Sequence, residues 1–220
     1  MITSPRRPAD PFSARGPQDL ADLVRSQPLA WICSQGTDGP LSTPLPLMPR
    51  FAPDGRLLAV EGHFARSNPQ VAALRTDNAA SILWMGVQGY VSPSWMADRT
   101  QAPTWNYATA RLKVVVRFDD DPQVLLRHLR ELTQQQEAAR TGAWAIDEMG
   151  PRLAQLAQRI VSFRADVVEC HERYKLGQDE RDDVFADILA GLETAGEFAL
   201  VDWMRRFNPG RGADPAASAE

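Results

Sequence analysis

Short apolar or alternating stretches dominate the first half of the chain and predict β-strands. They are separated by the sequences GTDGP, APDG and GVQG, whose glycine, proline and aspartate residues favour chain reversal. One further stretch, 161–170, alternates with period two and predicts a strand that returns to the sheet. The five earlier stretches are 29–35, 41–49, 56–62, 79–86 and 109–118. Strands of this length and spacing favour a barrel or a sandwich.

Helical periodicity lies mainly outside this region. Apolar residues at helical spacing behind a proline predict a short amphipathic helix at 17–27. Asn68 and Pro69 suit the N-cap and the first helical position, so one short helix is expected directly after them. From residue 122 the period changes, and three more helices are expected at 122–140, 151–160 and 181–196.

Composition separates the two ends of the chain from a central domain. Segments 1–15 and 208–220 are rich in proline, glycine, alanine and charge, which predicts flexible tails. Hydrophobic residues make up 44% of the 220 residues, enough for a full core. We therefore expect residues 16–207 to form a single domain whose C-terminal part is helical.

Charge and cysteine content limit the possible partners. The net charge is −4 and the isoelectric point is near 5.5, so direct DNA binding is unsupported by charge. No window approaches the roughly 20 apolar residues of a membrane span. Cys33 and Cys170 lack metal-ligand spacing and fit a reducing compartment. We expect a soluble cytoplasmic protein with neither a membrane segment nor a metal site.

Arg66, Ser67 and Asn68 form a candidate anion site. The free N–H groups of the helix expected to begin after Asn68 should point back toward Ser67 and Arg66. Aligned donors, the positive end of a helix dipole and a guanidinium are what a phosphate monoester requires. An ordinary capped surface helix with a solvent-facing arginine explains the same residues.

Aromatic residues gather in segment 90–108, which we interpret as a loop. It carries Tyr90, Trp95, Trp105 and Tyr107 among turn-forming residues. Such side chains provide a stacking wall for a flat ligand, a dimer contact, or anchors that hold the loop on the core.

Other polar residues give weaker signals. Lys175, one of two lysines, suits a phosphate contact or a flavin-edge donor, although most lysines are simply surface residues. The three histidines lie far apart, and His128 is expected to be solvated on a polar helix. No Ser-His-Asp or Cys-His arrangement can be singled out, so hydrolytic chemistry is unsupported.

The succession GHFARSNPQ, YVSPSW, PTWNYA, AWAIDE and YKLGQD resembles the PaiB family of FMN-binding negative transcriptional regulators. The resemblance extends from about residue 10 to about residue 206. It implies an α+β fold, a split β-barrel related to the pyridoxamine-phosphate oxidase and flavin reductase group, with C-terminal helices. It also implies a homodimer with FMN at the subunit interface.

The resemblance implies the roles of individual residues. Arg66, Ser67 and Asn68, with His63 nearby, occupy the place where such barrels hold the flavin phosphate. Thr43 and Leu45 belong to a strand that would lie along the isoalloxazine ring. The remaining implied contacts are Trp105, Asn106 and Tyr107 from the partner subunit, and Lys175 with Gln178, which would close the site.

The chain departs from the family pattern where a ligand would lie. The family usually has histidine at the position of Pro44, tryptophan at Val71, histidine at Arg111, and serine and asparagine at Gly177 and Asp179. Each change removes a donor or a stacking face, and Arg111 supplies a possible replacement charge. The expected ligand is therefore FMN or another phosphate-bearing small molecule.

Three functions are consistent with these features. The first is an FMN-binding regulator, or a sensor of redox state or of a metabolite. The second is an FMN-dependent oxidoreductase, in which the flavin performs the chemistry and the protein positions it. The third is a split-barrel dimer that has lost FMN and binds another small molecule or a protein partner.

Overall fold

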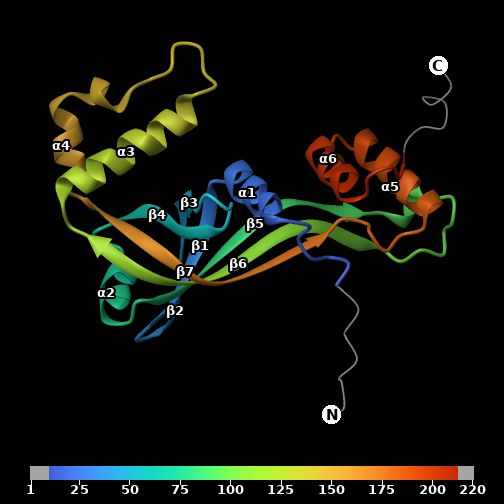
Figure 1. Cartoon of the computed structure of the whole chain (residues 1–220), viewed down its shortest axis with the longest axis horizontal. Helices are drawn as coiled ribbons and strands as arrows, with labels where there is room; N and C mark the ends of the chain where they lie inside the picture. Colours follow the sequence, from blue (N-terminus) through green and yellow to red (C-terminus); the bar gives the residue numbers. More distant parts are fainter. Residues whose placement is uncertain (1–9, 213–220) are drawn as a thin grey trace. The chain divides into compact units, whose positions relative to one another are not determined.

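The computed structural model describes residues 10–212, which contain one seven-stranded sheet and six α-helices. The strand order is β2-β1-β5-β6-β7-β4-β3 (Figure 1). The strands are β1 (Leu29–Gly36), β2 (Gly39–Pro46), β3 (Met48–Phe51), β4 (Leu57–Ala65), β5 (Ala79–Val91), β6 (Thr104–Asp119) and β7 (Ile160–Lys175). The helices are α1 (Pro17–Ser26), α2 (Pro69–Thr76), α3 (Pro122–Glu137), α4 (Pro151–Ala157), α5 (Asp182–Thr194) and α6 (Phe198–Phe207), with 3₁₀ turns η1 (Pro93–Trp95) and η2 (Ile146–Met149).

The described residues divide into two compact units. The larger unit comprises 17–84 and 110–171, and the smaller unit comprises 10–16, 85–109 and 172–212. The division falls within β5, β6 and β7, so each of these strands contributes residues to both units. The single domain expected over 16–207 stays a prediction.

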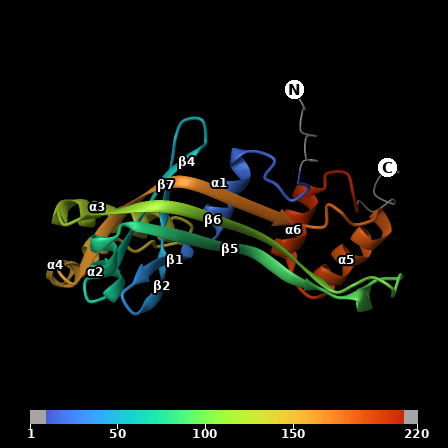
Figure 2. The ribbon, with the colours of Figure 1, turned by 90° about the horizontal axis from the view of Figure 1, so that it is seen from below.

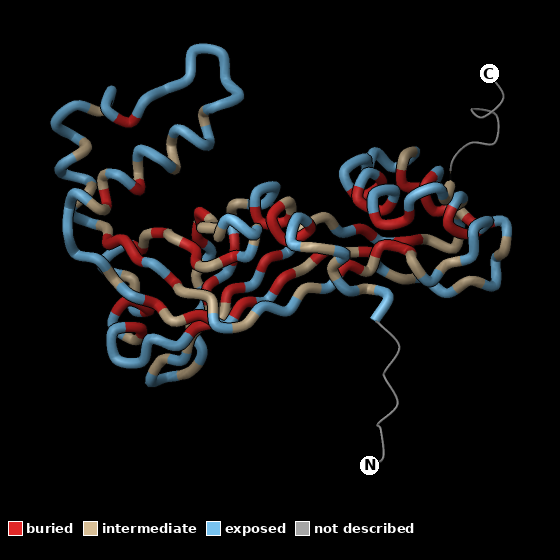
Figure 3. Tube along the Cα trace, in the orientation of Figure 1, coloured by how far each residue is buried: buried red, intermediate tan, exposed pale blue. Residues whose placement is uncertain are grey.

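The core of the larger unit follows from alternation along its strands. Ala30 and Ile32 of β1 are buried, whereas Leu29 and Trp31, which alternate with them, are exposed, as expected for successive side chains on opposite faces. Trp84 of β5 is also buried, and its Nε1 donates to the carbonyl of Gln27 at 2.7 Å. In Figure 2, α2 lies beside β1 and β2, with which it makes contacts. Buried positions recur along these strands in Figure 3.

The smaller unit is built around α5 and α6, which pack together (Figure 1). Tyr174 of β7 stacks on Phe207 with ring centroids 4.8 Å apart, and Trp203 completes the stack. Gly191 of α5 is required by close packing, because a Cβ atom there would lie 2.3 Å from the Trp95 ring. Aromatic packing therefore supplies much of the core of this unit.

Most predicted elements are confirmed, with differences at their boundaries. The stretch 41–49 forms two strands, β2 and β3, with Leu47 between them. The loop predicted at 90–108 is wrong at both ends, because β5 continues to Val91 and β6 begins at Thr104. Pairing within the sheet extends both strands beyond the apolar runs that marked them. The sequence pattern did not predict α6, which follows closely after Gly196.

Part of the predicted N-terminal tail is bonded to the smaller unit. The carbonyl of Phe12 accepts the amide of Tyr174 at 2.8 Å, and Asp10 pairs with Arg173 at 3.1 Å. The Arg15 guanidinium lies 3.8 Å from the ring centroid of Phe207. The parts of the two predicted tails at 1–9 and 213–220 lie outside the described residues. Over residues 10–212, no helix has the length and apolar character needed to span a membrane.

Candidate functional site

Asn68 fixes the N-terminus of α2 in the larger unit. Its backbone is extended, with φ −69° and ψ 124°, and its Oδ1 accepts the amide of Gln70 at 2.8 Å. Its Nδ2 donates to Thr43 Oγ1 at 3.0 Å, which ties the cap to β2. The predicted N-cap and the predicted helix start at Pro69 are therefore confirmed.

Gln70 connects this helix end to two strands. The residue is 0% exposed. Its Nε2 donates to the carbonyl of Ile32 at 3.1 Å and to Ser34 Oγ at 3.0 Å, while its Oε1 accepts the Thr43 hydroxyl at 2.7 Å. A buried amide with its bonds satisfied holds its neighbours in one arrangement. Sequence analysis missed this residue, because a glutamine in the first turn of a helix gives no sign of burial.

Arg66 and Ser67 are exposed immediately before the cap. Arg66 donates to Asp120 at 2.8 Å, and Arg75 donates to the same carboxylate at 2.8 Å. The Arg66 guanidinium and, second, that of Arg75 lower the pKa of Asp120 by hydrogen bonding to its charged form. Within residues 10–212, neither the amide nor the hydroxyl of Ser67 has a hydrogen-bond partner. This end of α2 thus offers the unused donors of Ser67 beside the exposed guanidinium of Arg66.

An adjacent cavity of about 330 Å³ extends from Arg66 along the start of α3. Asp120 and Pro122 line it at the start of α3, and Leu125 and Ala157 belong to its apolar wall. Of the residues before α2, Arg66 lines this cavity, whereas Ser67 and Asn68 do not.

β2 lies at an edge of the sheet, so one side of its backbone has no neighbouring strand within residues 10–212. Leu45 is buried, and Thr43 is engaged with Asn68 and Gln70 as described above. Pro44, opposite Trp31 in the β1–β2 register, has no N–H to offer. A planar ligand along this edge would therefore meet the carbonyls and the remaining amides of β2.

His63 of β4 lies against α3. Its Nδ1 is 3.1 Å from Nε2 of His128, and the two rings are edge-on with centroids 5.3 Å apart. His128 is 5% exposed, so the expectation that it is solvated was wrong. Burial lowers the pKa of His63 and lowers the pKa of His128 to about 4. The available signal was that His128 lies three residues after Leu125, on the same face of the helix.

The other predicted site residues lie in the smaller unit. Trp105 is 52% exposed and Tyr107 is half-buried on β6. Lys175 Nζ donates to Thr104 Oγ1 at 2.5 Å and to the carbonyl of Trp105 at 3.1 Å, which joins β7 to β6. Asn106 is buried; its Nδ2 contacts Met204 Sδ at 3.5 Å, and its Oδ1 has no partner among the described residues.

Gln178 and Gly177 form a tight turn after β7. Gln178 Oε1 accepts the amide of Leu176 at 2.7 Å, and its Nε2 donates to the carbonyl of Tyr174 at 2.6 Å. Gly177 has φ +83°, and a Cβ atom would lie 3.0 Å from the Phe185 ring. This geometry explains why glycine occupies a position where the family usually has serine.

The predicted site residues therefore fall into two groups. Thr43, Arg66, Ser67 and Asn68 are brought together in the larger unit, where His63 turns toward α3 and the Leu45 side chain enters the core. Trp105, Tyr107 and Lys175 are close in the smaller unit. The flavin-binding role of every one of these residues stays a prediction.

Solved structures define the class of fold. The chain resembles the flavocytochrome Anf3 from Azotobacter vinelandii, with a TM-score of 0.56 and 14% identity over 71% of this chain and 66% of that one. It also resembles the FAD and heme binding protein from Mycobacterium smegmatis, with a TM-score of 0.53 and 19% identity over 81% and 78% of the two chains. The fold is a split β-barrel, as predicted.

Sequence comparison then gives the family. Residues 8–169 match the family described as "Putative FMN-binding domain", and the chain belongs to this family. It is 24% identical over 185 residues to the protease synthase and sporulation protein PAI 2 of Bacillus subtilis (strain 168), covering 83% of this chain and 86% of that protein. The predicted membership of the PaiB family is confirmed.

Proposed function

We propose that the protein binds FMN as a homodimer and acts in negative transcriptional regulation, as a sensor of redox state or of a metabolite. The observation that carries this proposal is the set of unused donors before α2. Ser67 offers an amide and a hydroxyl, and Arg66 offers an exposed guanidinium. These groups fit a phosphate monoester.

The surrounding residues support the same placement. The Asn68 side chain is occupied by Gln70 and Thr43, so we assign it to holding the helix end in shape. When Arg66 turns to a phosphate, Arg75 remains as a partner for Asp120, and that carboxylate is not left unpaired. Bound FMN would supply hydride and electron transfer, while the protein positions it.

The homodimer brings a second set of residues to each flavin. We propose that Trp105 and Tyr107 reach the flavin of the partner subunit and that Lys175 with Gln178 closes the site. The exposed aromatic surface of Trp105 supports this role. Leu29, Trp31 and Leu83 supply an exposed apolar surface on β1 and β5, where Trp31 and Leu83 are register partners. We propose this surface as the contact between the two copies.

Regulation is proposed to be indirect. A net charge of −4 gives the molecule as a whole no electrostatic attraction for the phosphate backbone, which supplies the sequence-independent part of DNA affinity. Retention on nonspecific DNA that weakens steeply with salt would show direct binding and contradict the indirect route. The cytoplasmic location also stays a prediction.

The first test is the visible absorbance of the purified protein, before and after FMN is added and excess ligand is removed by desalting. A flavin spectrum at about one FMN per chain is the expected result. A colourless protein that takes up no FMN would overturn the proposal.

The placement of the phosphate is tested with Arg66→Ala. We expect FMN binding to weaken by about 1.5–3 kcal/mol, the range for a hydrogen bond to a charged group. The measurement is quenching of FMN fluorescence on titration with protein. Arg56→Ala is the matched control, since Arg56 is exposed and its ion-pair partner is Asp54. Equal affinities for wild type and Arg66→Ala would show that the phosphate lies elsewhere.

A further inference from the structure

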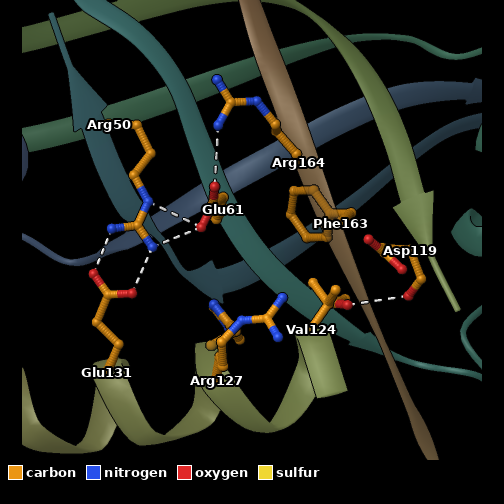
Figure 4. Close-up of a pocket in the computed structure, with 10 residues that line it drawn as sticks. Arg50, Glu61, Asp119, Val124, Arg127, Glu131, Phe163 and Arg164 are labelled. Atoms are coloured by element: carbon orange, nitrogen blue, oxygen red, sulfur yellow. Dashed lines mark hydrogen bonds and ion pairs between the residues drawn. The ribbon is translucent and has the colours of Figure 1, made fainter. Parts of the chain in front are cut away.

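A second cavity of the larger unit, of about 400 Å³, lies between α3 and the strands β3, β4 and β7. Figure 4 shows Arg127 of α3 facing the strands that carry Glu61, Phe163 and Arg164. The volume is within the range of pockets that take small molecules. Arg66, Ser67 and Asn68 do not line this cavity, so it is separate from the proposed phosphate site.

Four of the six charged side chains in its wall form ion pairs with one another: Arg50, Glu61, Glu131 and Arg164. Arg50 Nη2 donates to Glu61 at 2.7 Å and to Glu131 at 2.7 Å, and Arg164 donates to the other Glu61 oxygen at 3.1 Å. Hydrogen bonds from Arg50 lower the pKa of Glu131 and keep it ionised. The Asp119 carboxylate accepts the amide of Asp121 at 2.9 Å. Every acidic group of the wall therefore already accepts a hydrogen bond, and Figure 4 shows those of Glu61 and Glu131. Within residues 10–212 the Asp119 carboxylate has no ion-pair partner.

One arginine of the wall has no partner among the described residues. Within the described part of the chain, Arg127 has neither an ion pair nor a hydrogen-bond partner, and it is exposed to an incoming ligand. The next residue, His128, also lines the cavity and is 5% exposed, yet its Nδ1 has no hydrogen-bond partner among the described residues. A buried polar nitrogen without a partner is rare in folded proteins. Both residues line the cavity, and each presents a nitrogen without a partner among the described residues.

We propose that this cavity binds a small monocarboxylate, with its carboxylate on Arg127 and its carbon body against Phe163 and Val124. Among the described residues, Arg127 is the one arginine of the wall without an ion pair, and a single guanidinium matches one negative charge better than the two of a phosphate monoester. The planar guanidinium accepts a carboxylate through two parallel hydrogen bonds. Phe163 and Val124 provide the apolar part of the wall. When His63 Nδ1 donates to His128 Nε2, His128 Nδ1 carries a proton, and a carboxylate oxygen would be its acceptor.

The test uses 4-fluorobenzoate as the probe, with binding followed by fluorine NMR line broadening. Wild-type protein is expected to show saturable binding, and the neutral analogue 4-fluorobenzamide is expected not to bind. Arg127→Met keeps the length of the side chain and removes the charge, and it should weaken binding roughly ten- to a hundredfold. The matched control is Arg130→Met on the same helix, where the partner is Asp147 outside the cavity, and binding should be unchanged.

Several outcomes would overturn the proposal. They are an absence of saturable 4-fluorobenzoate binding by the wild type, equal binding by Arg127→Met, or equal binding of the benzamide. If Arg127→Met fails to fold, Arg127→Lys provides the comparison, since it keeps the charge but loses the two-pronged contact and should bind more weakly than wild type. Arg66→Ala should leave 4-fluorobenzoate binding intact, so failure of the flavin proposal is distinguishable from failure of this one.

Discussion

At the scale of single residues, Gln70 determines how the start of α2 is held. Its buried amide bonds to a carbonyl of β1, to a serine of β1 and to a threonine of β2. The donors proposed for a phosphate lie within four residues of it. Their position therefore depends on a side chain that does not itself reach the ligand.

Replacing Gln70 with leucine keeps similar volume and removes these hydrogen bonds. We expect the free energy of unfolding to fall by about 1–3 kcal/mol, because buried polar partners such as the Ile32 carbonyl lose their donor. Urea denaturation measures the change. Gln35→Leu is the control, since the Gln35 side chain is exposed and donates to the carbonyl of Gly36. A loss no larger than that of the control would contradict the role given to Gln70.

Sequence reasoning succeeded for residues whose role is local and missed those whose role depends on packing. Asn68 was predictable because a cap is defined by its own neighbours along the chain. Gln70 and His128 were not, because each is buried by segments distant in sequence. The same distinction applies to Arg66: its position just before the cap was predicted, but its ion-pair partner, Asp120, is distant in sequence and was not.

At the scale of elements, the His63–His128 contact joins β4 to α3. Burial lowers the pKa of both imidazoles below 6.5, and for His128 the value is about 4. Burial is the largest cause of the lowered pKa of His128; His63 and Arg50 also lower it, whereas Glu61 and Glu131 raise it by less. The contact between strand and helix is therefore made by two neutral rings at neutral pH.

This contact predicts a loss of stability in mild acid. The unfolded chain protonates His128 near pH 6.5 and the folded chain only near pH 4, so the unfolded state gains protons first as the pH falls. The difference corresponds to about 3 kcal/mol, which is present above pH 6.5 and lost progressively toward pH 4. His128→Leu should reduce this loss, as measured by urea unfolding at pH 7 and pH 4. His171→Leu, at an exposed position, should leave it unchanged, and identical pH dependence in all three proteins would refute the expectation.

The elements themselves were largely predictable, and their lengths were not. Alternation located the strands, but β5 and β6 run further than their apolar segments because pairing within the sheet, rather than propensity, decides where a strand ends. α6 was missed because its ten residues follow a glycine and a short connection, and its helicity is secured by packing of Trp203 and Phe207.

At the scale of the whole molecule, the apolar surface formed by Leu29, Trp31 and Leu83 bears on assembly. Trp31 is 50% exposed although it lies in the middle of β1, and large aromatic side chains are enriched at interfaces. The proposed dimer would bury this surface and bring the partner's residues to the flavin. Sequence alternation could place Trp31 on one face of β1, but not reveal which face is left open.

Trp31→Glu should prevent this assembly, because a carboxylate would be buried without a partner in the interface. Light scattering at micromolar concentration should give twice the chain mass of 24.4 kDa for the wild type and the single mass for the variant. Leu156→Glu changes another exposed apolar residue, on α4, and should remain dimeric. A monomeric wild type would contradict the dimer, and a dimeric Trp31→Glu would place the interface elsewhere.

The way in which β5, β6 and β7 are shared between the two units has a practical consequence for evolution and for engineering. No single peptide bond separates one unit from the other, since cutting between them would sever three strands. Neither unit can be exchanged by recombination at a linker or released by one proteolytic cut. The residues proposed to meet the flavin are consequently inherited together, as one gene segment whose parts cannot be shuffled independently.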